Sequence, residues 1–199
     1  MLEVLESREL LSTTLNVIGS PNTPYTLQQF GGPPAAALVQ NGIVQLAAPT
    51  ASGQGGQDNS ISFNTSDPGG FYQVNATWVF TVTPVTGLGT GLSFALLNTS
   101  VYGTTGGAAS SNVAQGLYSG SVAFGFDTTN NVVNLSLNGQ VVDSVDLTTL
   151  TTPVTLDSGK PIEADAVFDF PSIGSQSGSG TVSLTLTPFN ATTPVPVFT

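Results

Sequence analysis

The sequence predicts an all-β fold, a sandwich of two antiparallel sheets. Only 7% of the 199 residues are charged, while 23 are Gly and 13 are Pro, a composition typical of strands and turns. From Leu15 onward, apolar and polar residues alternate in short runs, and clusters of Gly, Pro, Asn and Asp separate them. A chain of this length suits a single domain with its own core.

The first dozen residues carry the only helical pattern in the chain, because Met1 to Ser12 pairs leucines with glutamates at helical spacing. Leu5 to Leu11 resembles the N-terminal Leu-Glu-Pro-Arg-x-Leu-Leu sorting motif of large exported bacterial surface proteins, with Ser7 in place of Pro. The resemblance implies a secreted or cell-surface protein; the alternative is a disordered N-terminus. We therefore expect a sorting segment at residues 1–13 and one sandwich domain at residues 14–199.

The clearest strand runs from Tyr72 to Val82, where every second residue from Val74 to Val82 is apolar. This pattern places Trp78 in the core, whereas a sugar-stacking role would require the same face to be exposed. The other expected strands share this short alternation, and they are 43–47, 60–64, 92–97, 121–127, 133–137, 141–147, 162–170 and 181–187.

Turn residues set the connections between these strands. Asn138-Gly139 lies between two of them and predicts a two-residue type I′ hairpin. Pro194 and Pro196 limit residues 193–199 to an edge strand or a tail, because proline cannot donate a hydrogen bond to a neighbouring strand.

The residue inventory excludes several classes of chemistry. The chain has no His and no Cys, so it cannot build a Ser-His-Asp triad, a cysteine nucleophile or a His-liganded zinc site. A net charge of −10 with two basic residues, Arg8 and Lys160, argues against nucleic acid and anionic membrane surfaces. No apolar run reaches about 18 residues, so no membrane insertion is expected. Neutral ligands and divalent cations remain as partners.

Five stretches resemble, in order and spacing, the legume-type (L-type) lectins. Ser121–Thr128 is similar to the family's Val-Ala-Val-Glu-Phe-Asp-Thr strand, which leads into its metal loop. The other four resemble further lectin strands, and they are Gly91–Leu96, Ile61–Phe63 with Ala76–Val82, Val133–Asn138, and Ala164–Phe170 with Thr181–Leu186. The resemblance extends from about Leu15 to Thr187 and implies a concanavalin A-like jelly roll.

The same resemblance implies a sugar site at one loop apex, formed by Thr90, Gly106, Gly107, Asn130 and Asn131. In the family, an Asp before the Gly-Leu-Ala-Phe strand accepts hydrogen bonds from vicinal sugar hydroxyls. Thr90 holds that position here, and its neutral hydroxyl is a weaker acceptor than a carboxylate. The site is therefore expected to be degenerate.

The implied metal ligands are Asp127, the carbonyl of Thr129, and Asn131. Gly125 replaces a Glu of the family and the chain has no His, so no Mn²⁺ is expected. Calcium takes six to eight oxygens, so these three ligands would make only a weak Ca²⁺ site. In the alternative interpretation, Asp127 and Asn131 cap a turn through local backbone hydrogen bonds.

An enzymatic alternative rests on Glu163, Asp165 and Asp169, which share one face of an expected strand. Some β-glucanases share the jelly roll and place three carboxylates on one strand. Here the third carboxylate comes too late in the sequence, and with one Trp and four Tyr an aromatic-rich cleft is absent. The alternative is a solvated face whose charges prevent edge pairing. We expect no enzymatic activity.

The sequence thus supports three hypotheses in order: a non-catalytic module that binds neutral glycans, a structural or adhesive sandwich that has lost the sugar site, and a glycoside hydrolase. Lectin sandwiches often pair through their flat back sheet, so the resemblance also allows a homodimer. Five Asn-x-Ser/Thr sequons matter only in a host that glycosylates, and they begin at Asn64, Asn75, Asn98, Asn134 and Asn190.

Overall fold

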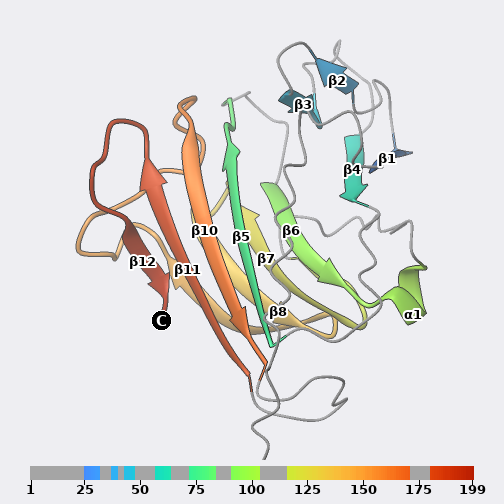
Figure 1. Ribbon diagram of the computed structural model, residues 1–199. Helices are drawn as coiled ribbons and strands as arrows, with labels where there is room; N and C mark the ends of the chain where they lie inside the picture. The colour runs from blue at the N-terminus through green and yellow to red at the C-terminus, as the bar shows by residue number, and fades with distance from the viewer. Residues whose placement is uncertain are drawn as a thin grey trace, which may run out of the picture.

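The structure is a computed structural model that describes residues 25–31, 37–39, 43–47, 57–63, 72–83, 91–103, 116–170 and 180–199. Within these residues the chain forms strands and one short helix (Figure 1). Their bounds are β1 (Tyr25–Gly31), β2 (Ala37–Val39), β3 (Ile43–Gln45), β4 (Gln57–Phe63), β5 (Gln73–Phe80), β6 (Gly91–Leu97), α1 (Thr99–Tyr102), β7 (Ser121–Asp127), β8 (Val132–Leu137), β9 (Gln140–Asp146), β10 (Ile162–Asp169), β11 (Thr181–Pro188) and β12 (Val195–Phe198). The helix expected at Met1 to Ser12 and the boundary at residue 13 lie outside the described residues.

Two four-stranded antiparallel sheets form the sandwich. We call the sheet with the order β12-β11-β10-β5 sheet I, and the sheet with the order β6-β7-β8-β9 sheet II. Figure 1 shows them as two layers. The pairs β1-β4 and β2-β3 form two further small antiparallel sheets. The prediction of an all-β sandwich of antiparallel sheets is therefore confirmed.

The core lies between the inner faces of the two sheets and is rich in aromatic rings. Trp78 of sheet I stacks on Phe94 of sheet II with ring centroids 4.3 Å apart. Phe124 of sheet II packs against Phe168 of sheet I at 5.5 Å. Such pairs add about 0.5–1.5 kcal/mol each beyond the burial of apolar area. The expected core position of Trp78 is confirmed, and its ring makes a direct contact between the two sheets.

Alternation with period two explains why β5 and β10 bury one face each. Along β10 the even positions from Ile162 to Phe168 are buried, whereas Glu163 is exposed and Asp165 and Asp169 are half-buried. The same alternation along β5 turns Trp78 inward. Each expected strand overlaps an observed one, with ends that differ by a few residues.

The Asn138-Gly139 hairpin joins β8 to β9 as expected. Leu137 pairs with Gln140, so the loop has two residues, and the φ angles of 51° at Asn138 and 78° at Gly139 are both positive, as a type I′ turn requires. The turn also binds the residue that precedes β7, because Asn138 Oδ1 accepts the Gly120 N–H at 2.7 Å.

Three elements differ from the sequence expectation. α1 was missed because four residues are too short for a periodic pattern, although Asn98 caps the helix by accepting the Ser100 N–H. The other two are β1 and β2, which were not among the strands expected from the sequence.

At the C-terminus, β12 pairs with β11 at the edge of sheet I, which confirms the edge-strand alternative for residues 193–199. Among the described residues, no helix is long and apolar enough to cross a membrane.

Candidate functional site

The turn between β7 and β8 contains four of the residues that the sequence singled out. Asp127 ends β7, and its Oδ1 accepts the N–H groups of Thr129 at 2.9 Å and Asn130 at 3.0 Å. Its Oδ2 accepts the side-chain amide of Asn130 at 2.8 Å. The carboxylate therefore fixes the turn from within, and we call residues 127–131 the apex turn.

Asn131 connects the apex turn to a segment far along the chain. Its Nδ2 donates to the Val154 carbonyl at 2.8 Å, and its Oδ1 accepts the Leu156 N–H at 3.0 Å. Its own carbonyl accepts the Leu147 N–H at 3.1 Å. Asn131 has a φ of 55°, a left-handed conformation that Asn tolerates better than most residues. The turn and the loop of residues 147–156 are thus one hydrogen-bonded unit.

The exposed part of the apex turn consists of Thr129 and Asn130. Both side chains lie at the same end of sheet II as Gly91, which opens β6 and pairs with Asp127. This register brings the strand that begins at Gly91 beside the strand that ends at Asp127. The remaining expected sugar-site residues, Thr90, Gly106 and Gly107, lie outside the described residues.

The side-chain oxygens implied as calcium ligands also accept hydrogen bonds from within the protein. Both carboxylate oxygens of Asp127 already accept hydrogen bonds, and Asn131 Oδ1 accepts the Leu156 N–H. In the described parts of the chain, no three His, Cys, Asp or Glu side chains cluster closely enough to hold a metal ion. The local bonds of Asp127 match the turn-capping alternative, but that alternative is wrong for the side chain of Asn131, whose partners Val154 and Leu156 are distant in sequence. Calcium ligation by Asp127, Thr129 and Asn131 stays a prediction.

A second Asp turn lies beside the apex turn, at the end of β9. Asp127 and Asp146 both pair with Val132 of β8, one from each side. Asp146 Oδ1 accepts the hydroxyl of Thr148 at 2.6 Å and its N–H at 2.8 Å. These two hydrogen bonds hold the pKa of the Asp146 carboxyl below its ordinary value of 3.8.

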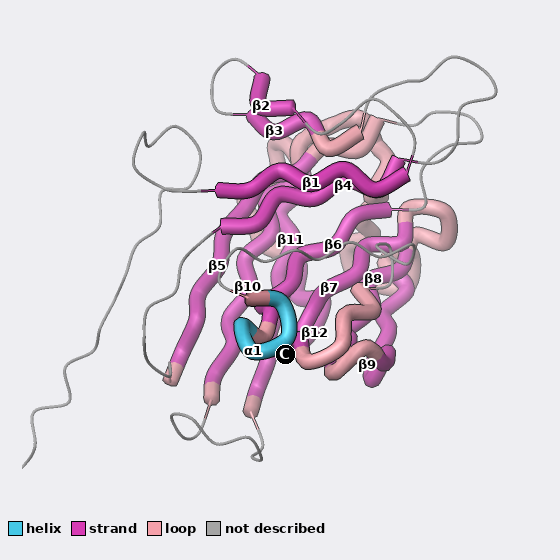
Figure 2. The backbone as a smooth tube through the Cα atoms, turned by 90° about the vertical axis from the view of Figure 1, so that its right-hand side faces the viewer, coloured by secondary structure: helices cyan, strands magenta, loops and turns pink. Residues whose placement is uncertain are grey.

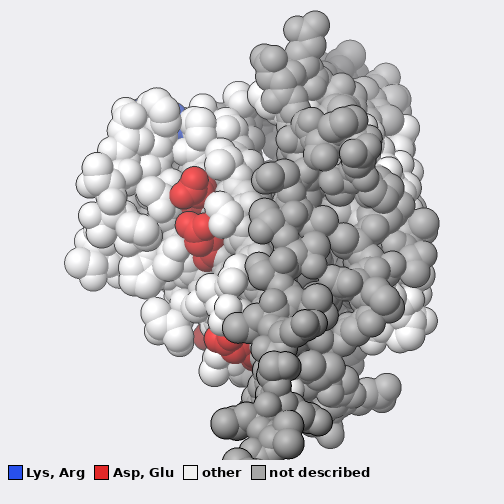
Figure 3. Space-filling view, viewed as in Figure 1, with Lys and Arg blue, Asp and Glu red and all other residues white. Residues whose placement is uncertain are grey.

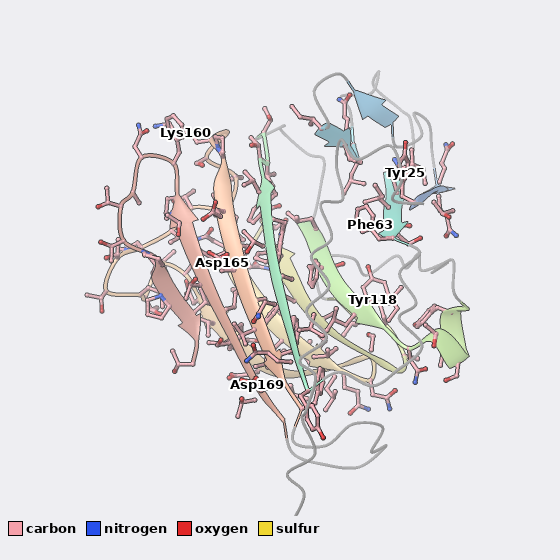
Figure 4. The ribbon with its side chains drawn as sticks, in the orientation of Figure 1. Tyr25, Phe63, Tyr118, Lys160, Asp165 and Asp169 are labelled. Carbon is pink, nitrogen blue, oxygen red and sulfur yellow. The ribbon has the colours of Figure 1, made fainter. Side chains whose placement is uncertain are left out.

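The three carboxylates of β10 share the outer face of sheet I, as expected. Figure 3 shows acidic side chains along this face, and Figure 4 places Asp165 and Asp169 on β10 with Lys160 at one end of the strand. Thr77 donates its hydroxyl to Asp165 and Gln73 donates its amide to Asp169, each at 2.6 Å.

The wider pair of these carboxylates, Asp165 and Asp169, is too far apart for glycoside hydrolysis. Asp165 and Asp169 are four strand residues apart, about 13 Å at ordinary strand rise, which exceeds the separation used by retaining or inverting glycosidases. Glu163 and Asp165 are closer, yet their neighbours on β5 are Val79 and Thr77, which are not aromatic. No aromatic residue of β5 therefore pairs with Glu163 or Asp165, and the absence of enzymatic activity stays a prediction.

An open hollow of about 490 Å³ beside β12 was also not expected from the sequence. Residues 150–152 and 191–196 line it, and threonines and prolines dominate. No charged side chain belongs to the lining. Only the paired threonines in both segments could have indicated it, because the two segments meet through the fold.

A scan of the chain against protein-family models returned no match, and a comparison with curated proteins also returned none. The candidate site therefore rests on the geometry of the described residues and on the lectin-like motifs of the sequence.

Proposed function

We propose that this chain is a non-catalytic carbohydrate-binding module of an exported or cell-surface protein, and that it binds neutral glycans at the apex turn without a metal ion. The observation that carries the proposal is the rigid presentation of Thr129 and Asn130. Both are exposed, and the turn below them is held by Asp127 and Asn131 through hydrogen bonds within the protein.

Preorganisation supports binding at this turn. Ordering a loop upon binding costs free energy, and a turn that is already fixed avoids much of that cost. In a metal-dependent lectin-type site the cation would fix the Asp and the Asn. Here the N–H groups of Thr129, Asn130 and Leu156 occupy their oxygens instead.

The negative net charge of the chain favours neutral over anionic glycans as ligands. The chain carries a net charge of −10, which disfavours sulfated or uronic acid glycans through like-charge repulsion. The hydroxyl of Thr129 can donate and accept, and so can the amide of Asn130, so both side chains can recognise sugar hydroxyls.

The test is a glycan array followed by titration calorimetry on the strongest neutral glycan. We expect binding that persists in EDTA, and a melting temperature that is equal in EDTA and in millimolar Ca²⁺, because a cation that bound the native state would raise it. Asn130→Ala should abolish binding while the chain stays folded. The matched control is Asn75→Ala, on the exposed outer face of sheet I, which should bind as the wild type does.

A second candidate is a structural or adhesive sandwich that has lost sugar binding. The commitment of both polar atoms of the Asn131 side chain to the backbone of Val154 and Leu156 favours it, because a sugar would have to displace these bonds. A folded wild-type chain that binds no glycan on the array would select this candidate. A glycan cleavage that disappears in Glu163→Gln would overturn both and reinstate the hydrolase.

A further inference from the structure

The outer edge of β9 is exposed along almost its whole length. β9 is the last strand of sheet II, and only Val145 of its seven residues is partly buried. Figure 2 shows β9 at the rim of the sheet, beside β8. Within the described parts of the chain, no strand pairs with this edge, and an open edge is a template for another strand.

One backbone group at this edge is capped by its neighbour. Ser144 and Asn134 face each other across β8 and β9, and their side chains are joined by a 2.6 Å hydrogen bond. Such a close side-chain contact is typical of a non-hydrogen-bonded pair, in which the Ser144 N–H points away from β8. That N–H donates to Asp143 Oδ1 at 2.8 Å. The carboxylate thus occupies the donor that an incoming strand would need.

A bulge and two exposed apolar residues also affect how the outer edge of β9 could pair with another strand. The register shifts between Leu135 and Ser136, a bulge that leaves Val142 without a partner on β8. On β9 itself, the apolar residues Val141 and Val142 are 42% and 56% exposed. An edge with apolar side chains would favour association unless something blocks it.

We propose that the β9 edge is a latent pairing surface for a second copy of this chain, and that Asp143 keeps it closed by capping the Ser144 N–H. Symmetry favours a second copy as the occupant. In an antiparallel pair centred on Ser144, Asp143 lies opposite Val145 of the second copy, and Asp146 lies opposite Val142. No carboxylate faces another one, and the contact closes as a twofold dimer.

The cap can be separated from the charge by two substitutions at one position. Asp143→Ala removes both, whereas Asp143→Asn removes the charge and keeps an oxygen that accepts the Ser144 N–H. Asp157→Ala is the matched control, since it removes one carboxylate outside the strands. Asp143→Val is a second variant that removes both the cap and the charge, and valine is favoured in strands.

The measurement is the mass of the full chain by sedimentation velocity at high micromolar concentration, with circular dichroism as the folding check. We expect Asp143→Ala and Asp143→Val to double the wild-type mass, and Asp143→Asn and Asp157→Ala to leave it unchanged. Adding Val142→Lys to Asp143→Ala should restore the wild-type mass. The proposal is overturned if the Ala and Val variants keep the wild-type mass, if Asp143→Asn associates equally, or if Val142→Lys leaves the doubled mass.

Discussion

The apex turn and the Asp146 turn lie side by side at one end of sheet II and are built from the same local hydrogen bonds. In each, an Asp at the end of a strand accepts the N–H of a Thr two residues later. They differ in which groups make the distant contacts: in the apex turn the Asn131 side chain binds the backbone of Val154 and Leu156, whereas in the Asp146 turn the backbone of Leu147 binds that of Asn131 and Val154, and among the described residues the Asp146 side chain bonds with Thr148 alone. A carboxylate shapes a turn, but the amide of Asn131 attaches it to the core.

The comparison predicts the largest effect for Asn131→Ala. The change leaves the Val154 carbonyl and the Leu156 N–H without partners in almost wholly buried residues, at roughly 1–3 kcal/mol each. The positive φ of Asn131 adds about 1 kcal/mol of strain for alanine. We therefore expect the free energy of unfolding, measured in urea, to fall by about 3 kcal/mol or more.

The control is Asn131→Gly, which tolerates the positive φ and still lacks the amide. It should lose slightly less stability than the alanine variant. If Asn131→Ala cost less than about 1 kcal/mol, one ordinary hydrogen bond, the amide would not be what attaches the turn.

Asp127→Ala should have an intermediate effect. It removes the acceptor for the N–H groups of Thr129 and Asn130, but water can reach these groups at the surface. We expect a loss of about 1 kcal/mol in the same urea experiment, similar to the loss of a helix cap. Asp127→Asn keeps one acceptor oxygen and should lose less; an equal loss would show that charge outweighs the hydrogen bonds.

The smallest effect is expected for Asp146→Asn, and it should depend on pH. The Thr148 hydroxyl and N–H lower the pKa of the Asp146 carboxyl below 3.8, so the ionised form stabilises the fold. This contribution is complete above the unfolded-state pKa and disappears as the pH falls through the lower folded-state pKa.

The wild type should therefore be slightly more stable than Asp146→Asn near neutral pH and equally stable well below pH 3.8, as measured by urea midpoints. A stability difference that stays constant across this range would show that the carboxyl charge is not responsible. Thr148→Val, which lacks the hydroxyl, should reproduce part of the difference near neutral pH.

Local patterns predicted the sandwich well because they act over a few residues. Period two in β5 and β10 sufficed to place Trp78 inside and Glu163 outside. Asn138-Gly139 sufficed for the hairpin, because only residues that tolerate positive φ fit it.

The site was less predictable because its decisive contacts are long-range. The partners of Asn131 lie 23 and 25 residues away, and no spacing rule connects them. The cap on Ser144 depends on which side of β9 its N–H faces, which follows only from the register with β8. Both features require the assembled sheet.

Because Asn134 is buried in the folded protein, its sequon can be glycosylated only before sheet II forms. Its side chain is 8% exposed, and its Oδ1 accepts the Ser144 hydroxyl across the sheet, whereas Asn98 stays exposed in its sequon. In a secretory host that modifies such sequons, Asn134 is open to the transferase only until β8 pairs with β7 and β9. The ratio of glycan occupancy at Asn134 to that at Asn98 would therefore record how long the nascent chain waits before sheet II closes.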